Sequence, residues 1–341
     1  MKKFISNYQK HFILFLSLFV LITFSGCHLF SSDQSKQSSS LKKVRLCEVA
    51  HSIFYAPQYV ALELDYFKQE GLNIVLTNGN GADNVMTSLI SNDADIGFMG
   101  SEASIYIYSE GAENYAINFA GLTQRAGNFL VSRTKDADFK WSDLKDKTVI
   151  GGRSGGMPEM VFEYILKKNQ INPKDVNIIQ NINFGSTAPA FSSGTGDYTI
   201  EFEPFATSLE NEGKGYVTAS LGVESGFVPY TAYCALQSYL NENEDTLNRF
   251  TAAIQKGLDY VQTHTAQEIA NVIHPQFPET DLATLTQIVA RYQNQNTWKS
   301  TTYFDQKSYD LLIDILKESN QLKKEAPYTK LVTTKFSKER R

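Results

Sequence analysis

Several carboxylates stand where apolar runs of the sequence end in polar turns. They are Glu102, Glu159, Glu201 and Glu203. A buried carboxylate repels nitrate or a sulfonate, whereas it pairs well with the N–H donors of an aminopyrimidine or of a cationic amine. These residues favour the binding of a neutral or basic nitrogen heterocycle. An anionic ligand is the alternative, because the cationic side chains of Arg125 and Arg153 could pair with it.

Some of these side chains also suit a purely structural role. Glu159 and Glu203 fall in the first turns of predicted helices, where an acidic group complements the helix dipole. His51 suits polar packing as well as a hydrogen bond to a ligand. Tyr55 lies nearer than Tyr59 to a predicted loop, so it is the better candidate for a platform on which a ligand ring stacks.

A glycine-rich turn spans residues 151–156 and reads Gly-Gly-Arg-Ser-Gly-Gly. It lacks the closing Gly-Lys-Ser/Thr of a nucleotide phosphate loop, and the chain has no GxGxxG motif. We therefore expect its backbone amides to face a small ligand. The histidines and cysteines are scattered without the spacing of metal ligands, so neither a metal nor a cofactor is predicted.

The elements that must position these residues alternate between strand-like and helix-like patterns. Continuous apolar runs predict strands, and apolar residues at helical spacing predict helices between them. The expected strands lie at 44–49, 72–76, 95–99, 115–122, 148–151, 176–180 and 198–202. Strands alternating with helices indicate parallel βαβ units, so we expect an α/β protein with two similar lobes.

From residue 241 onward the apolar period is helical throughout. These helices have no strands of their own to cover, so we expect them to pack on the first lobe. The chain leaves that lobe near Phe129 and returns near Thr231, and two crossings of this kind form a hinge. The expected division places lobe one at 42–128 and 230–341, and lobe two at 129–229.

In a doubly wound sheet a ligand binds beyond the carboxyl ends of the strands, where the following loops converge. This rule selects candidate ligand-binding residues from both lobes. Those of lobe one are His51, Ser52, Tyr55, Asn80, Ser101, Glu102, Gln124 and Arg125. Those of lobe two are Ser154, Gly155, Gly156, Met157, Glu159, Glu201 and Glu203.

The N-terminal residues resemble an export signal. Lys2, Lys3 and Lys10 precede an apolar run at 12–24, which is shorter than a membrane-spanning helix requires. The run ends in Phe-Ser-Gly-Cys, which is similar to a bacterial lipobox except that Phe replaces the usual Leu. We expect a signal peptide at 1–26 and a lipid anchor on Cys27. A polar, flexible tether would follow at 27–41.

The composition is that of a globular protein with a formal net charge of −5. A net-acidic chain without a basic tract argues against nucleic acid as a partner, and we expect a monomer. Apart from Cys27, the cysteines are Cys47 and Cys234. Both lie in apolar, strand-like runs, which favours buried free thiols over a disulfide.

The order of several short segments resembles one family. They are Tyr-Ala-Pro-Gln-Tyr-Val-Ala at 55–61, Tyr-Phe-Lys-Gln-Glu-Gly-Leu at 66–72, Ala-Asp-Ile-Gly-Phe at 94–98, Leu-Lys-Asp-Lys-Thr-Val-Ile-Gly at 144–151 and Phe-Glu-Pro at 202–204. The chain is similar to the nitrate/sulfonate/taurine and thiamine-pyrimidine group of ABC-transporter binding proteins. The resemblance implies a type II periplasmic-binding fold, a small-molecule ligand and permease subunits of an importer as partners. Together with the export signal and the lipobox-like segment, it indicates an extracytoplasmic protein that is anchored to the bacterial cell membrane by lipid on Cys27.

Enzymes of similar fold, the pyrimidine-precursor synthases, are the rival interpretation. They use a lysine that holds pyridoxal phosphate, a donor histidine and a cysteine-rich motif. In this sequence Met99 stands at the lysine position, Ala103 near the histidine position, and Cys234 is alone. The resemblance therefore favours a binding protein without catalytic residues.

Overall fold

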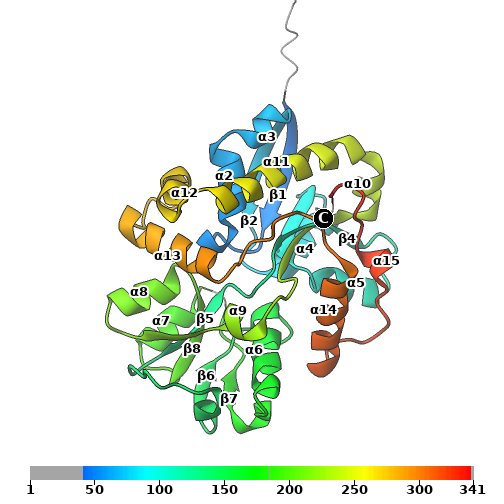
Figure 1. The fold of residues 1–341 in the computed structure, drawn as a ribbon. Helices are drawn as coiled ribbons and strands as arrows, with labels where there is room; N and C mark the ends of the chain where they lie inside the picture. The colour runs from blue at the N-terminus through cyan, green and yellow to red at the C-terminus, as the bar shows by residue number, and fades with distance from the viewer. Residues whose placement is uncertain (1–40, 184, 339–341) are drawn as a thin grey trace, which may run out of the picture. The chain divides into compact units, whose positions relative to one another are not determined.

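The computed structural model describes residues 41–183 and 185–338, so the predicted signal peptide, Cys27 and most of the tether lie outside the described residues. Two five-stranded sheets form its framework (Figure 1). Sheet A has the order β2-β1-β3-β10-β4, and sheet B has the order β7-β6-β8-β5-β9. We call the residues around sheet A lobe one and those around sheet B lobe two. The predicted two-lobed α/β fold is confirmed.

The strand bounds are as follows. Sheet A contains β1 (Lys42–Glu48), β2 (Leu72–Asn78), β3 (Ile96–Gly100), β4 (Ala116–Thr123) and β10 (Thr231–Leu236). Sheet B contains β5 (Asn128–Ser132), β6 (Thr148–Ile150), β7 (Asn177–Ile179), β8 (Tyr198–Phe202) and β9 (Tyr216–Ser220).

The sheets are mixed, whereas the sequence pattern predicted parallel units. The strands β1, β2 and β3 pair in parallel, as do β6, β7 and β8. However, β10 runs antiparallel between β3 and β4, and β5 runs antiparallel between β8 and β9. The antiparallel strands β5 and β10 each follow one crossing between the lobes. The exact lobe boundaries stay a prediction.

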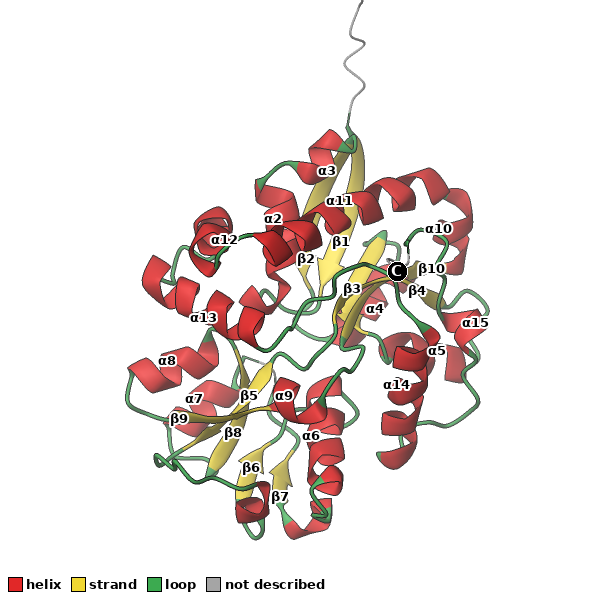
Figure 2. Ribbon diagram, in the orientation of Figure 1, coloured by secondary structure: helices red, strands yellow, loops and turns green. Residues whose placement is uncertain are grey.

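Helices cover the sheets (Figure 2). Lobe one carries α2 (Ala56–Glu63), α3 (Tyr66–Gln69), α4 (Ala82–Ile90) and α5 (Ala103–Ser109). Lobe two carries α6 (Met157–Lys168), α7 (Thr187–Ser192), α8 (Phe205–Asn211) and α9 (Leu221–Ser225). The C-terminal helices are α10 (Gln237–Glu242), α11 (Glu244–Thr263), α12 (Ala266–Ile273), α13 (Leu282–Asn294), α14 (Gln306–Glu318) and α15 (Tyr328–Leu331). The short 3-10 turns are η1 (Ile53–Tyr55), η2 (Trp141–Leu144), η3 (Pro173–Asp175) and η4 (His274–Gln276).

The C-terminal helices reach further than the sequence pattern predicted. The apolar face of α11, which includes the buried Leu247, Phe250 and Ile254, packs on lobe one as expected. In addition, Arg291 of α13 pairs with Glu203 of lobe two, and Lys167 of α6 donates to the backbone carbonyl of Glu318 at the end of α14. The chain therefore joins the lobes through these packed helices as well as through the two crossings.

The two buried thiols are free, as the sequence predicted. Cys47 and Cys234 both pair with Gly97 of β3, one from each side. Neighbouring strands lie about 4.8 Å apart, so the two Cα atoms are separated by roughly twice that spacing. A disulfide needs Cα atoms within about 7 Å. The register of sheet A thus keeps the thiols apart.

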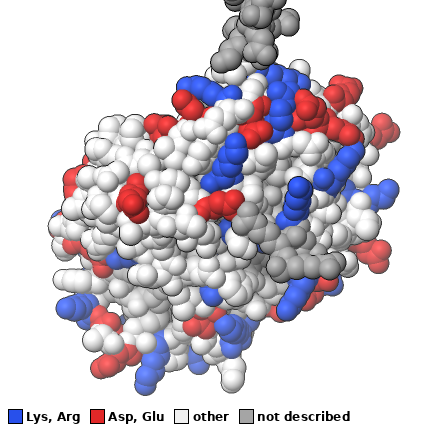
Figure 3. All heavy atoms as spheres, turned by 45° about the horizontal axis from the view of Figure 1, so that its top comes forward, with Lys and Arg blue, Asp and Glu red and all other residues white. Residues whose placement is uncertain are grey.

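Surface charge is interspersed on the face that Figure 3 shows, where Lys and Arg lie among Asp and Glu. This face lacks the continuous basic stripe that nucleic-acid-binding domains carry. Within residues 41–183 and 185–338, none of the helices has the length and apolar character needed to cross a membrane.

Candidate ligand-binding cleft

A cavity of about 480 Å³ lies between the loops of sheet A and those of sheet B. Its wall is mostly apolar and includes several large aromatic side chains. They are Tyr55, Tyr106, Phe202, Phe205 and Tyr230. Cavities of roughly 300–1,000 Å³ hold small-molecule ligands in many proteins, and a few polar groups on an apolar wall then fix the ligand's orientation. The polar groups of this wall therefore decide what it binds.

Glu102 is the most unusual of these polar groups. It is 3% exposed and lies directly before α5, where its carboxyl group folds back over the Cα atom of Gly100. Its Oε2 atom has no hydrogen-bond partner among the described residues. Burial raises the pKa of Glu102 to about 8. A buried acceptor without a partner is costly, and a donor from a ligand would satisfy it.

Glu201 faces the cavity from the other lobe. It lies in β8, is 2% exposed, and accepts hydrogen bonds from the hydroxyl groups of Thr187 at 2.9 Å and Thr199 at 2.6 Å. Burial raises its pKa to about 7, although the two hydroxyl groups oppose that rise. Glu102 and Glu201 thus bring one buried carboxyl group from each lobe to the cavity.

The glycine-rich turn lies at the cavity wall, as the sequence predicted for Ser154, Gly155, Gly156 and Met157. Positive φ angles of 92° at Gly152 and 77° at Gly155 give the turn a path that side chains with a Cβ atom rarely follow. Tyr106 of lobe one donates a hydrogen bond to the Gly155 carbonyl at 2.7 Å. The turn is therefore held against the opposite lobe.

An ion pair spans the cavity wall beside this turn. The guanidinium group of Arg153 pairs with Asp83 of α4, with Nη1–Oδ1 and Nη2–Oδ2 distances of 3.0 and 3.3 Å. Both side chains are half exposed. Arg153 alone is cationic among the described residues that line the cavity. Its charge is thus already matched by a carboxylate.

Four predicted site residues hold other parts of the fold together and do not line the cavity. The Ser52 hydroxyl donates to the Glu203 carbonyl at 2.8 Å, and the Ser101 hydroxyl donates to the Pro229 carbonyl at 2.5 Å. The Gln124 amide donates to the carbonyl groups of Asn296 and Trp298. Arg125 donates to the Gly222 carbonyl at 2.9 Å. They contact residues near the crossings and the C-terminal segment. Asn80 is exposed and also lies outside the cavity wall.

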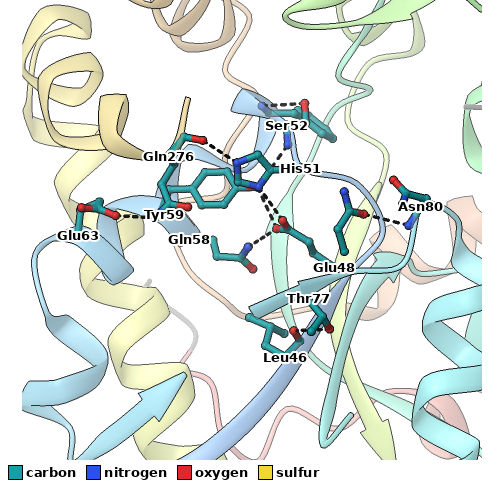
Figure 4. A network of polar contacts seen from close by, with 12 residues as sticks. Leu46, Glu48, His51, Ser52, Gln58, Tyr59, Glu63, Thr77, Asn80 and Gln276 are labelled. Carbon is teal, nitrogen blue, oxygen red and sulfur yellow. Dashed lines mark hydrogen bonds and ion pairs between the residues drawn. The ribbon is translucent and has the colours of Figure 1, made fainter. Parts of the chain in front are cut away.

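His51 belongs to a polar network inside lobe one (Figure 4). Its Nδ1 atom lies 2.8 Å from a carboxylate oxygen of Glu48, and its Nε2 atom lies 2.8 Å from the Gln276 carbonyl oxygen. Glu48 is 1% exposed and also accepts from Gln58 and Tyr59. Both ring nitrogens face acceptors, which favours the doubly protonated imidazolium form. His51 therefore joins β1 to η4.

We expect this histidine to make stability depend on pH. Burial lowers the His51 pKa, but the hydrogen bonds to Glu48 and Gln276 and the charges of Glu48 and Glu279 raise it above its usual 6.5. The contribution of His51 to the free energy of unfolding is complete below pH 6.5, the pKa of the unfolded state. It disappears as pH rises through the higher pKa of the folded state. His51→Gln should cost about 1 kcal/mol at pH 6 and less at pH 8, measured by urea denaturation. An equal cost at both pH values would contradict the imidazolium assignment.

Glu159 and Glu203 lie behind the cavity wall. Glu159 accepts from the Gly155 backbone N–H at 3.1 Å and from the Gln180 amide at 2.8 Å. Burial, followed by the neighbouring Glu163, raises its pKa to about 8. Glu203 accepts from the Thr207 backbone N–H at 2.9 Å in the first turn of α8 and pairs with Arg291 at 2.6 Å. Both carboxylates therefore support neighbouring backbone.

Sequence reasoning missed several side chains that line the cavity. They are Asp83, Met86, Tyr106, Phe202, Phe205 and Tyr230. Tyr106 lies one helical turn after Glu102, a spacing that places both on one helix face and could have indicated it. The others depend on how the lobes face each other. No group of side chains with the arrangement of a metal site occurs within the described residues.

Comparison with known proteins relates this geometry to a family. The model of the family described as NMT1/THI5 like matches residues 53–268. The chain belongs to the NMT1/THI5-like family. The "Putative binding protein YtlA" of Bacillus subtilis (strain 168) is 44% identical over 322 residues, which cover 94% of this chain and 94% of that protein. The resemblance found in the short segments is thus confirmed at the level of the family.

Two proteins of lower sequence identity are named for different functions, one as an enzyme and one as a binding protein. The 4-amino-5-hydroxymethyl-2-methylpyrimidine phosphate synthase of Aspergillus parasiticus is 23% identical over 227 residues, which cover 62% of this chain and 64% of that enzyme. The structure of the alkanesulfonate-binding protein SsuA from Xanthomonas axonopodis pv. citri bound to MOPS has a TM-score of 0.70 at 12% identity. The matched region covers 86% of this chain and 98% of the SsuA chain. The NMT1/THI5-like chain therefore shares the fold of periplasmic binding proteins.

Proposed function

We propose that this chain is an extracytoplasmic solute-binding protein that delivers a small nitrogen heterocycle, such as a pyrimidine precursor, to an ABC importer. One observation carries the proposal: an apolar, aromatic cavity contains the buried Glu102 carboxyl group, whose Oε2 atom has no partner. A flat heterocycle packs against aromatic walls, and its N–H groups satisfy buried carboxylates.

The family supports the importer role. A binding protein is named among the relatives, and the fold is that of a periplasmic protein with a bound sulfonate. In such proteins a ligand that contacts both lobes favours the closed arrangement, which a permease subunit can sense. We propose that Cys27 carries the lipid anchor, that the protein acts as a monomer, and that nucleic acid is not a partner.

Two alternative functions remain distinguishable. A sulfonate- or nitrate-type ligand is suggested by the fold of the sulfonate-binding protein. The cavity disfavours it because Arg153 is paired with Asp83 and two acidic groups face the ligand space. A synthase is suggested by the fungal relative. Met99 and Ala103 lack the side chains that its chemistry would need at these positions, so a binding protein is favoured.

A thermal-shift screen of the purified protein tests the ligand class. Ligands would be 4-aminopyrimidines, amines, sulfonates and nitrate, each at a concentration near 100 times a micromolar Kd. Such an excess stabilises a protein by about 2.7 kcal/mol, which corresponds to a rise in Tm of roughly 5 °C or more. We expect 4-aminopyrimidines to raise Tm. A shift with sulfonates or nitrate alone would contradict the proposed ligand class.

A further inference from the structure

The N-terminus of α6 presents backbone N–H groups to the cavity. This twelve-residue helix begins at Met157 beside the cavity, and its N-cap residue Gly156 provides no side-chain hydrogen bond. Helix N-termini carry unpaired N–H groups and a partial positive charge, so they attract oxyanions. Pro158 has no N–H, which leaves Met157 and Glu159 as the donors nearest the cavity.

Glu102 already lies at this position. Its carboxyl group is 97% buried and lines the same cavity as Met157. The backbone N–H of Met157 lies close enough to lower the pKa of Glu102 against the rise that burial causes. The contact crosses the cleft, because Glu102 precedes α5 of lobe one and Met157 begins α6 of lobe two. The carboxyl group therefore approaches the start of α6, while its Oε2 atom has no hydrogen-bond partner among the described residues.

We infer that Glu102 is a specificity-determining residue that occupies the oxyanion position at the α6 N-terminus, so that the cleft excludes sulfonate- and nitrate-type anions and offers Oε2 to a ligand N–H. The inference rests on the proposed binding function and names the group that selects the ligand. Other charges around the position agree with it. Glu201 lines the cavity from lobe two, and the cation Arg153 is held by Asp83.

Two variants separate the two roles of this carboxylate. Glu102→Ala removes the side chain and exposes the Met157 N–H to the cavity. Glu102→Gln has nearly the same shape and keeps an oxygen at the helix, but its neutral amide cannot ionise beside a ligand N–H. Neither substitution strains the backbone, since Glu102 has helical φ and ψ angles of −67° and −28°. Circular dichroism would confirm that both variants fold.

The test is isothermal titration calorimetry with methanesulfonate and nitrate on the wild type and both variants. We expect Glu102→Ala to bind methanesulfonate at least tenfold more tightly than the wild type and Glu102→Gln do. Equal binding by all three proteins, or no gain in Glu102→Ala, would overturn the inference. If Glu102→Ala does not fold, Glu102→Gln still tests the inference. Binding of methanesulfonate by Glu102→Gln as tight as its binding of a 4-aminopyrimidine would overturn the inference.

The same titrations with a 4-aminopyrimidine keep this inference separate from the proposed function. Binding by the wild type, with at least tenfold loss in both variants, is expected. If the wild type binds no aminopyrimidine or amine while Glu102→Ala gains methanesulfonate, the proposed ligand class fails and the role of Glu102 in excluding anions stands. If the wild type binds the aminopyrimidine and Glu102→Ala gains no anion, only the role of Glu102 fails.

Discussion

Replacing Arg291 by methionine is expected to lower the free energy of unfolding by about 3–5 kcal/mol. Arg291 lies on α13 and pairs with Glu203 at 2.6 Å and with Glu210 at 3.0 Å. The Glu203 side chain is fully buried, so the variant leaves a buried carboxylate without its cation. Burial raises the pKa of Glu203, and Arg291 opposes that rise. Urea denaturation at pH 7 would measure the loss.

The double variant Arg291→Met/Glu203→Gln is the matched control. It removes the cation and the buried charge together, so it should recover a large part of the stability lost in the single variant. Glu203→Gln alone should leave the affinity for a 4-aminopyrimidine unchanged, because Glu203 lies outside the cavity wall. Additive losses in the double variant would contradict the ion-pair argument. A loss of affinity for the 4-aminopyrimidine in Glu203→Gln would show that Glu203 contributes to ligand binding.

The ligand-free protein should become less stable as pH rises from 5 to 6.5. Burial raises the pKa of Glu102 to about 8, of Glu159 to about 8 and of Glu201 to about 7, against a usual value of 4.5. The folded state therefore binds protons that the unfolded state has released, so stability decreases with pH across this window. Each carboxyl group that stays protonated contributes a loss of about 2 kcal/mol over these 1.5 pH units.

Urea denaturation at pH 5, 5.75 and 6.5 would measure this slope in the wild type and in Glu102→Gln/Glu201→Gln. The window ends at pH 6.5 because His51 adds its own loss above that value. The double variant has two fewer titrating groups, so its stability should change much less with pH. Identical slopes in the two proteins would show that these carboxyl groups titrate near their usual pKa.

The sequence predicted the parallel strands and the helices between them well, because their patterns are local. The strand Tyr198–Phe202 was predicted at the observed bounds. The strands β5 and β9 were missed. Their sequences, Asn-Phe-Leu-Val-Ser and Tyr-Val-Thr-Ala-Ser, do not alternate regularly between apolar and polar residues, so no period of two marks them as strands. Their pairing depends on residues distant in the chain.

The candidate site was predictable only in part, because the sequence places residues in loops but does not fix their long-range contacts. The rule that ligands bind at the carboxyl ends of strands selected Tyr55, Glu102 and Glu201, which line the cavity. It also selected Ser52 and Ser101, whose hydroxyl groups bind backbone carbonyls instead. A loop position does not determine which way a side chain points. The direction depends on the groups that the opposite lobe offers, such as the Glu203 backbone carbonyl that Ser52 binds.

The segment between Pro57 and Gly71 forms two helices, α2 and α3, and the break between them has a local cause. Asp65 has a φ angle of 57°, which ends α2 and lets α3 begin in a new direction. Asp tolerates this left-handed conformation better than most residues because its short polar side chain can hydrogen-bond locally. The apolar period continues across the break, so Phe67 still reaches the core.

The central place of β10 in sheet A determines when the protein can fold. This strand lies between β3 and β4 but is made long after both of them. Until it is present, sheet A remains in two pieces whose facing edges have no partner, and α11 has no completed sheet beneath it. Contacts between residues so distant in sequence form slowly. Lobe one of the nascent chain therefore stays unfolded until β10 has been made, a state in which this part of the chain can still be threaded through a narrow channel.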